Sequence, residues 1–389
     1  MRGPLVKRKE IQLDKTFCNI LPIFEKHKEL NVRHTYILKV FWDKGSNGTV
    51  VPADVWVDGS NDKVLQGYFN FMIEVAVLLG ADETNAKDEL KKVMEFENSL
   101  ANIQMSSKDS MDPEKAYKPQ QLKGFQNNDD FPSSWTSYVQ KLYQYDEKDL
   151  EIKDDEIVIN GDTQFYKELG PILKNTTKRT LFNYIGWRVA KDALDYLTPE
   201  ARKISQKFNK LITGVEANTP RWQECIGEVG FNRGKNGKFN AAVSSMYARF
   251  IYSAAGKDEV IVMTDYLRKA FAKILDETKW MDSETKKEAV KKLANMKQFM
   301  AYPKELLEKD KVDGFYKELK IDDGKYFENA HKIDKHLRKH SDLKLREVVV
   351  AEEMLHGEWG GWSVALVNAY YDPFSNSIKF PAGYLQGML

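Results

Sequence analysis

The sequence predicts a mainly α-helical protein in which β-structure is limited to a few short hairpins. Apolar residues recur at three- and four-residue spacing through most of the chain after residue 61, which is the period of helices that pack on a core. Strand-like alternation is confined to short runs bounded by turn residues. With 389 residues, of which 42% are apolar, the chain has enough material for more than one compact domain.

The expected elements follow from these patterns and from the residues that begin and end them. Thr198-Pro199-Glu200, for example, supplies a capping residue, a first-turn proline and a first-turn acid. In chain order, we expect strand-like runs at 36–42 and 50–57, helices at 61–80 and 83–104, a polar connection at 106–132, a short helix at 135–145, a small hairpin at 150–159, helices at 163–175, 178–196, 199–216, 238–254, 257–277 and 282–300, a mixed charged segment at 313–345, and a final hairpin with strands at 364–372 and 377–381.

Charge and composition argue against several classes of partner. The 59 basic and 58 acidic residues leave a net charge of +1, so no overall field favours nucleic acid. The longest apolar stretch, 69–81, is interrupted by Asn70 and Glu74 and is too short to span a membrane. The N-terminus is basic but no apolar region follows it, so we expect neither a signal peptide nor a transmembrane anchor in this chain.

Two cysteines and two possible glycosylation sites bear on the compartment. Cys18 and Cys225 are too few for a disulfide-dense scaffold or a multi-cysteine metal cluster. Asn47 and Asn175 each begin an Asn-x-Thr acceptor sequence for N-glycosylation. Such sequences also occur by chance in a chain of this length, so they add little to a prediction of location.

The histidines provide the test for a metal site. His336 and His340 have the i, i+4 spacing that places two imidazoles on one helix face. A zinc peptidase also needs a glutamate directly after the first histidine and a third ligand farther on, but Leu337 follows His336. Because the neighbouring residues are basic, we favour a surface helix here. The sequence therefore predicts no metal ligands and no catalytic residues in this chain.

The final hairpin resembles a known family. Residues 367–386, VNAYYDPFSNSIKFPAGYLQ, are similar to the VNAYY and FPAGILQ stretch of the M13 metallopeptidases, the neprilysin and endothelin-converting-enzyme family. Blocks beginning at Asn183 (N-Y-x-x-W-R), Arg221 (R-W-x-x-C) and Trp280 (W-M-D-x-x-T-K) also resemble the family's blocks, in the family's order. The resemblance extends over residues 36–389. One departure is Ala301-Tyr-Pro, which stands where the family has Gly-Tyr-Pro.

This resemblance implies a fold of two largely helical lobes. Residues 1–350, of which 1–35 match poorly, are then the N-terminal, mainly helical, non-catalytic lobe, and 351–389 are the start of a thermolysin-like catalytic lobe. The family's HExxH and ExxxD zinc motifs are missing, so we expect a chain that is truncated, holds no zinc and is catalytically inactive as given. Zinc belongs to the full-length family members.

The resemblance also implies a peptide-binding edge. Asn368 and Ala369 correspond to the family's substrate-positioning residues on an edge strand, to which a small peptide adds as a further strand. The same edge could associate with another chain. The family pairs the cysteine of R-W-x-x-C with an upstream cysteine, so Cys18 and Cys225 are a possible disulfide, and its location is extracellular or on the cell surface. Three functions stay open: an inactive chain, a fragment of an active zinc endopeptidase, and a binding protein that captures peptides or partners without cleaving them.

Overall fold

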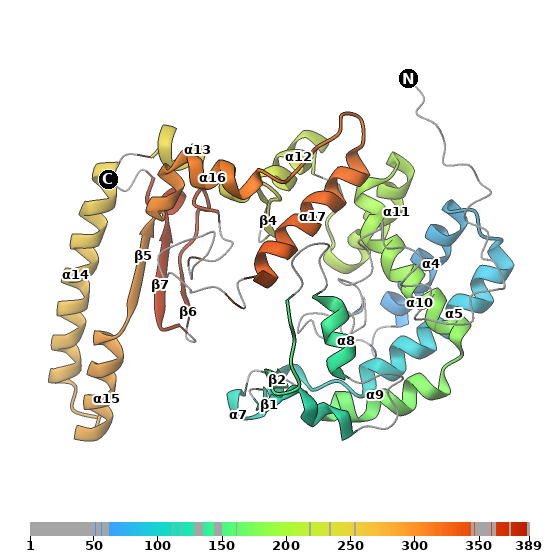
Figure 1. Cartoon of the computed structure of the whole chain (residues 1–389), viewed down its shortest axis with the longest axis horizontal. Helices are drawn as coiled ribbons and strands as arrows, with labels where there is room; N and C mark the ends of the chain where they lie inside the picture. Colours follow the sequence, from blue (N-terminus) through green and yellow to red (C-terminus); the bar gives the residue numbers. More distant parts are fainter. Residues whose placement is uncertain are drawn as a thin grey trace. The chain divides into compact units, whose positions relative to one another are not determined.

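The chain is mainly helical, which confirms the predicted fold class (Figure 1). The computed structural model describes residues 51, 56, 62–110, 112–116, 118–127, 135–143, 150–160, 162–217, 219–232, 235–252, 254–343, 346, 359, 363–372 and 375–386. The strand-like runs at 36–42 and 50–57 fall almost wholly outside these residues. Contacts divide the chain into a first unit of residues 1–218 and 322–335 and a second unit of 219–321 and 336–389. The lobe boundary near residue 350 stays a prediction.

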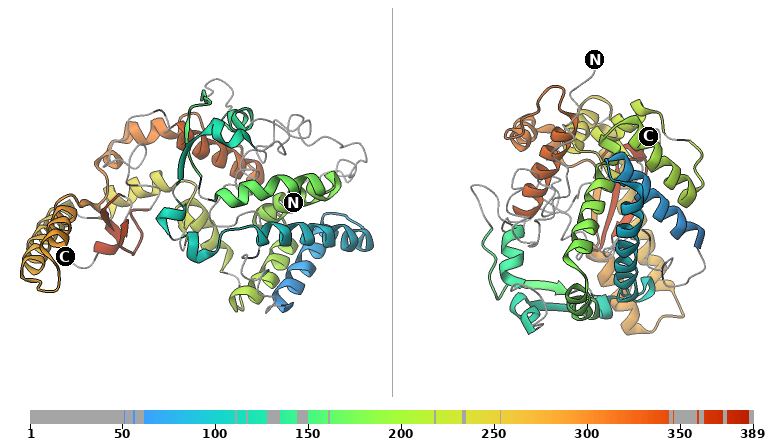
Figure 2. Two further views of the ribbon diagram at one scale, coloured as in Figure 1. Left: turned by 90° about the horizontal axis from the view of Figure 1, so that it is seen from below. Right: turned by 90° about the vertical axis from the view of Figure 1, so that its right-hand side faces the viewer.

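The first unit is built on long helices that carry clear start and stop signals. Their bounds are α4 (Asp62–Leu78), α5 (Glu83–Asn102), α9 (Thr163–Asn175), α10 (Lys178–Ala193) and α11 (Pro199–Thr213) (Figure 2). The side chains of Asp82, Asp162, Thr177 and Thr198 each accept a hydrogen bond from a backbone amide of the helix that follows. Gly80 follows α4 with a φ of 101°, a conformation that glycine adopts without strain. These helices confirm the sequence prediction to within a few residues.

A buried polar group lies at the centre of this unit. Glu97 is fully buried, and its two carboxylate oxygens accept the Tyr68 hydroxyl at 2.9 and 3.0 Å. The indole Nε1 of Trp187 donates to the same hydroxyl oxygen at 2.6 Å, and the Arg188 guanidinium lies beside the Tyr184 ring. Burial, followed by the charge of Glu97, raises the pKa of Tyr68. The N-Y-x-x-W-R block and Glu97 are therefore parts of one interior network.

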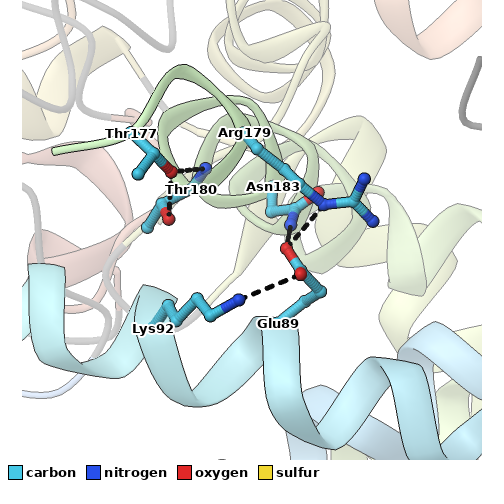
Figure 3. A network of polar contacts seen from close by, with 6 residues as sticks. All are labelled: Glu89, Lys92, Thr177, Arg179, Thr180 and Asn183. Atoms are coloured by element: carbon cyan, nitrogen blue, oxygen red, sulfur yellow. Dashed lines mark hydrogen bonds and ion pairs between the residues drawn. The ribbon is translucent and has the colours of Figure 1, made fainter. Parts of the chain in front are cut away.

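Asn183, the first residue of that block, faces a second network between α5 and α10 (Figure 3). Glu89 Oε2 accepts Arg179 Nε at 2.8 Å and Asn183 Nδ2 at 2.9 Å, while Oε1 accepts Lys92 Nζ at 3.1 Å. Partial burial opposes ionisation of Glu89, but the hydrogen bonds from Arg179 and Lys92 outweigh it and lower the pKa. Helix α10 is therefore joined to α5 directly through Glu89, and to Glu97 of α5 through Tyr68 of α4.

The connection between α5 and α9 contains short regular elements. These are α6 (Ser107–Ser110), α7 (Pro113–Ala116), β1 (Lys118–Gln121), the 3₁₀ helix η1 (Leu122–Asn127), α8 (Trp135–Leu142) and β2 (Ile157–Asn160). The prediction of a hairpin within 150–159 is wrong, because β2 pairs antiparallel with β1, which lies in the preceding polar connection. A pattern local to 150–159 carries no information about a partner so much earlier in the chain.

The second unit combines helices with a three-stranded sheet. Its elements are α12 (Arg221–Val229), β3 (Phe231–Asn232), β4 (Lys235–Asn236), α13 (Asn240–Phe250), α14 (Ala254–Glu277), α15 (Ser283–Ala294), β5 (Lys297–Ala301), the 3₁₀ helix η3 (Lys304–Leu307), α16 (Lys309–Tyr316), β6 (Tyr370–Asp372), β7 (Ser377–Pro381) and α18 (Ala382–Leu385). Helix α17 (Tyr326–Leu343) begins among residues of the first unit and ends among residues of the second. The sheet has the order β5-β7-β6.

Strand β5 corrects the sequence prediction of a helix over 282–300. Helix α15 ends at Ala294, where Asn295 forms the C-cap, and residues 297–301 form strand β5, which pairs in parallel with β7. Ala301, at the end of β5, is fully buried and has a φ of 59°. This left-handed conformation suits glycine, and the resemblance places a glycine here.

Helix α14 runs alongside this sheet and the end of α15 (Figure 1). Arg268 Nη2 donates to the carbonyls of Leu293 at 3.1 Å and Met296 at 2.6 Å, which fixes the turn between α15 and β5. The core includes Val260 of α14, Phe299 and Met300 of β5, and Trp359. Within the described part of the chain, no helix is both long and apolar enough to cross a lipid bilayer.

Candidate peptide-binding edge

The two residues implied to position substrate lie at the start of an edge strand. Asn368 and Ala369 directly precede β6, which pairs antiparallel with β7 through Tyr370–Lys379, Tyr371–Ile378 and Asp372–Ser377. No other described strand pairs with the outer side of β6. An extended peptide could add there as a fourth strand, because edge strands present backbone donors and acceptors to a partner.

Asn368 is exposed, and its side chain already accepts a hydrogen bond from one backbone N–H. Its Oδ1 accepts the N–H of Ala369 at 2.8 Å. An incoming backbone carbonyl could replace that oxygen, which would leave the Asn368 amide available to the peptide. The geometry is compatible with the implied role of both residues, and the role itself stays a prediction.

The turn between β6 and β7 depends on Asn376, which the sequence interpretation did not single out. This residue has a φ of 47°, a left-handed conformation that asparagine tolerates better than most residues. Its Nδ2 donates to the Lys292 carbonyl at 2.8 Å, its Oδ1 accepts the Tyr371 hydroxyl at 3.1 Å, and its backbone oxygen accepts the N–H of Lys297 at 2.9 Å. Asn376 therefore joins the turn to α15 and β5. Asparagine between two strands is a turn signal that could have identified it.

A lysine lies beneath the edge strand. Lys379 on β7 is only 6% exposed, and its Nζ lies 5.2 Å from the centre of the Phe299 ring and 5.7 Å from that of Tyr370. The same atom donates to the Trp359 carbonyl at 3.4 Å. Burial, followed by the charge of Asp372, raises the pKa of Tyr370. The ammonium thus holds neighbouring strands together through ring faces and a carbonyl.

The hairpin is anchored at both ends. The N–H of Val364 donates to Ser244 Oγ of α13 at 3.2 Å, and the N–H of Gly383 donates to the Val364 carbonyl at 2.8 Å. A Cβ atom at Gly383 would lie 2.4 Å from the Ala365 carbonyl oxygen, so the glycine of the FPAG stretch permits a close backbone approach.

The hairpin also has a partner strand from an earlier part of the chain. Strand β5 of this same chain supplies a third strand. The apolar side chains of the hairpin differ in exposure: Val367 is 75% exposed and Tyr371 is also exposed, whereas Ile378 and Phe380 are half-buried. How strongly the hairpin is held in solution stays a prediction.

The described residues do not fit a zinc site. Within the described ranges, no three His, Cys, Asp or Glu side chains come together in a group that could hold a metal ion. His336 and His340 do share one face of α17, with ring centres 4.3 Å apart. His336 is buried, however, which corrects the expectation of a surface position. Its ring packs against Phe315 and Tyr316 of α16.

Burial lowers the pKa of His336, and the nearby His340 adds to this effect. The other charged groups that act on it are Glu318, which favours its protonated form, and Lys339, which opposes it. Lys339 Nζ and Glu318 Oε2 are themselves 3.0 Å apart. The histidine pair is therefore part of the packing between α16 and α17, and its burial there disfavours the protonated form of His336.

The remaining predicted sites lie only partly within the described residues. Cys225 on α12 is exposed, and Cys18 lies outside the described residues, so the disulfide between them stays a prediction. Asn175 is an exposed residue at the end of α9, a position that a glycan could occupy. Asn47 also lies outside the described part of the chain.

Comparisons with known proteins identify the family. The model of peptidase family M13 matches residues 35–303. Neprilysin-2 of Drosophila melanogaster is 31% identical over 354 residues, which are 89% of this chain and 44% of that protein. Human neprilysin is 31% identical over 331 residues, 82% of this chain and 42% of that protein. The chain thus spans less than half the length of these relatives.

Solved structures agree on the fold. PepO from Lactobacillus rhamnosis has a TM-score of 0.70 at 19% identity, covering 86% of this chain and 49% of that one. The Mycobacterium tuberculosis zinc metalloprotease ZMP1 in its open state has a TM-score of 0.67 at 19% identity, over 87% of this chain and 49% of that one. The family model and the neprilysin relatives together show that this chain belongs to peptidase family M13.

Proposed function

We propose that this 389-residue chain captures extended peptides along β6 and does not hydrolyse them by itself. The observation that carries the proposal is the juxtaposition of Asn368 and Ala369 with an edge strand whose outer side pairs with no other described strand. The sequence contains no HExxH segment, so it offers no zinc-bound water for peptide hydrolysis.

Binding is expected to be modest and dominated by backbone hydrogen bonds. Three residues of β6 and the two that precede it give room for a peptide of about four to five residues at the usual strand rise. The exposed side chains of Val367 and Tyr371 provide apolar contacts beside the edge. We therefore expect a preference for short peptides with apolar side chains.

A binding assay with matched peptides tests this proposal. A short apolar peptide should bind the purified chain, and an analogue with N-methylated amides should bind much less, because it cannot complete the strand ladder. Asn368→Ala should weaken binding about 2- to 12-fold, the range of one hydrogen bond. Asn85→Ala, at an exposed asparagine of α5, is the control. Equal binding of both peptides would refute capture by strand addition.

The second candidate is a fragment of an active zinc endopeptidase, because the matched relatives are more than twice the length that this chain covers. An intact mass of the native protein well above that of 389 residues would favour it. So would cleavage of a fluorogenic peptide by that native protein in zinc-containing buffer. Either function agrees with a cell-surface or extracellular location, which stays part of the proposal, as do the Asn47 and Asn175 glycans.

A further inference from the structure

A lysine of α15 lies over the middle residue of the edge strand β6. Lys292 is exposed, and its Nζ is 5.9 Å from the centre of the Tyr371 ring. Asn376 joins these two residues, because its Nδ2 donates to the Lys292 carbonyl and its Oδ1 accepts the Tyr371 hydroxyl. Helix α15 leads directly into β5, which lies on the far side of β7 from β6. The Lys292 side chain therefore reaches the outermost strand of the sheet.

The charge of Lys292 is available to a partner. The carboxylates of α15, of the neighbouring part of α14 and of β6 have other partners. These pairs are Glu284–Lys287, Glu288–Lys291, Asp265–Gln298 and Asp372–Ser375. Among the described residues, no carboxylate forms an ion pair with Lys292. An exposed ammonium of this kind attracts a carboxylate that is brought beside it.

The alternation of side chains along the strands determines which residue of an added peptide meets this lysine. Successive side chains of a strand point to opposite faces, and paired residues share a face. Tyr371 pairs with Ile378, which pairs with Gln298, so these three side chains share the face on which Lys292 lies. A peptide residue paired with Tyr371 would have its side chain on this face too. The added strand lies about 4.8 Å beyond β6, within reach of the flexible lysine.

We infer that Lys292 selects, among peptides that add to β6, those with an acidic side chain at the position paired with Tyr371. This inference rests on the proposed capture of peptides at this edge. Val367 is 75% exposed, and on a continued strand it shares the face of Tyr371, four residues later. The ligand class is thus a short extended peptide with an apolar side chain near one end and a carboxylate near the other.

Four matched five-residue peptides test this inference on the full chain. Two carry Glu at either the first or the last position, with an apolar residue at the opposite end, so that both strand directions are covered. The other two carry Gln in place of Glu. In one direction the Glu peptide should bind about two- to fivefold more tightly than its Gln counterpart, which is the range of an exposed ion pair. This ratio should decrease in about 0.5 M salt.

Substitutions at Lys292 assign the preference to this side chain. Lys292→Gln should bring the ratio of the two dissociation constants close to one, and Lys292→Glu should favour a peptide with Lys at the same position. The ratio is compared within each variant, so a general change in affinity cancels. Asn376 bonds the backbone carbonyl of Lys292, which both variants keep. Lys287→Gln, which removes the same charge from an exposed position of α15, should retain the preference.

The outcomes separate this inference from the proposed function. Equal binding of the Glu and Gln peptides in both directions would overturn the inference and leave peptide capture intact, and so would a preference that survives Lys292→Gln. If none of the four peptides binds, peptide capture at β6 is refuted and the inference with it. Circular dichroism melting confirms that the variants fold.

Discussion

Substitutions at Asn376 test whether the β6–β7 turn is held by backbone conformation, by side-chain hydrogen bonds, or by both. At a φ of 47°, most L-residues are strained by about 1–2 kcal/mol relative to glycine. The two side-chain hydrogen bonds, to the Lys292 carbonyl and from the Tyr371 hydroxyl, lie near the surface and contribute about 0.5 kcal/mol each.

These contributions predict an order of stability. Asn376→Asp keeps an acceptor for Tyr371 and a residue that tolerates the left-handed region, so it should lose about 0.5–1 kcal/mol. Asn376→Gly removes both hydrogen bonds and adds chain entropy to the unfolded state, for a loss of about 1.5–2 kcal/mol. Asn376→Ala combines the lost bonds with backbone strain and should lose about 2–3 kcal/mol.

Native-state hydrogen exchange at Ile378 and Phe380 of β7 measures these differences locally, which matters because two compact units need not unfold together. Asn85→Ala in the first unit should not alter exchange in β7. The decisive comparison is alanine with glycine. If Asn376→Ala is no less stable than Asn376→Gly, backbone strain does not select asparagine here, and the explanation given for this turn is wrong.

Four further predictions concern other parts of the chain. Ala301→Gly should change the unfolding free energy by less than about 0.5 kcal/mol, because relief of backbone strain offsets the lost methyl burial and the added entropy of the unfolded chain. The β-branched Ala301→Val should lower the unfolding free energy, measured by urea unfolding, by more than about 2 kcal/mol. The pKa of His336 is lowered in the folded chain, so as the pH falls below about 6.5 the unfolded chain takes up this proton first and the unfolding free energy should decrease. His336→Gln should remove that part of the pH dependence. An unchanged pH profile in this variant would contradict the burial argument. Gly383→Ala, whose Cβ would meet the Ala365 carbonyl, should accelerate hydrogen exchange throughout the hairpin. After dialysis from zinc, metal analysis should find no stoichiometric zinc, and one tightly held ion that is lost in His336→Ala would refute this expectation.

The sequence predicts local structure well where a helix is long and its ends are marked. Thr198 caps α11 as its side chain and the following Pro199 indicate, and α5, α9 and α10 lie where their periodicity places them. The helical spacing that ends in α15 gave no sign that residues 297–301 would be extended. Their extended form depends on pairing with β7, a strand much later in the chain, and local patterns contain no such information.

In the candidate site, too, some features could be predicted from the sequence and others depend on distant parts of the chain. The family resemblance implied that Asn368 and Ala369 lie on an edge strand; in the structure they directly precede the edge strand β6, and their role toward a peptide stays a prediction. The sequence did not indicate that Lys379 and His336 are buried, because a lysine usually lies at the surface and His336 stands among lysines and an arginine. In both cases burial comes from aromatic rings on another element, so the three-dimensional packing decides it.

The parallel pairing of β5 with β7 has a consequence for synthesis on the ribosome. Strand β5 is complete once residue 301 has emerged, but its partner is translated about 80 residues later, which takes several seconds at ordinary elongation rates. During that interval Phe299 and Met300 have no strand beside them, although both are buried in the finished protein. A nascent chain paused between these two strands would present an incomplete sheet edge, and we expect chaperone contact to be concentrated there.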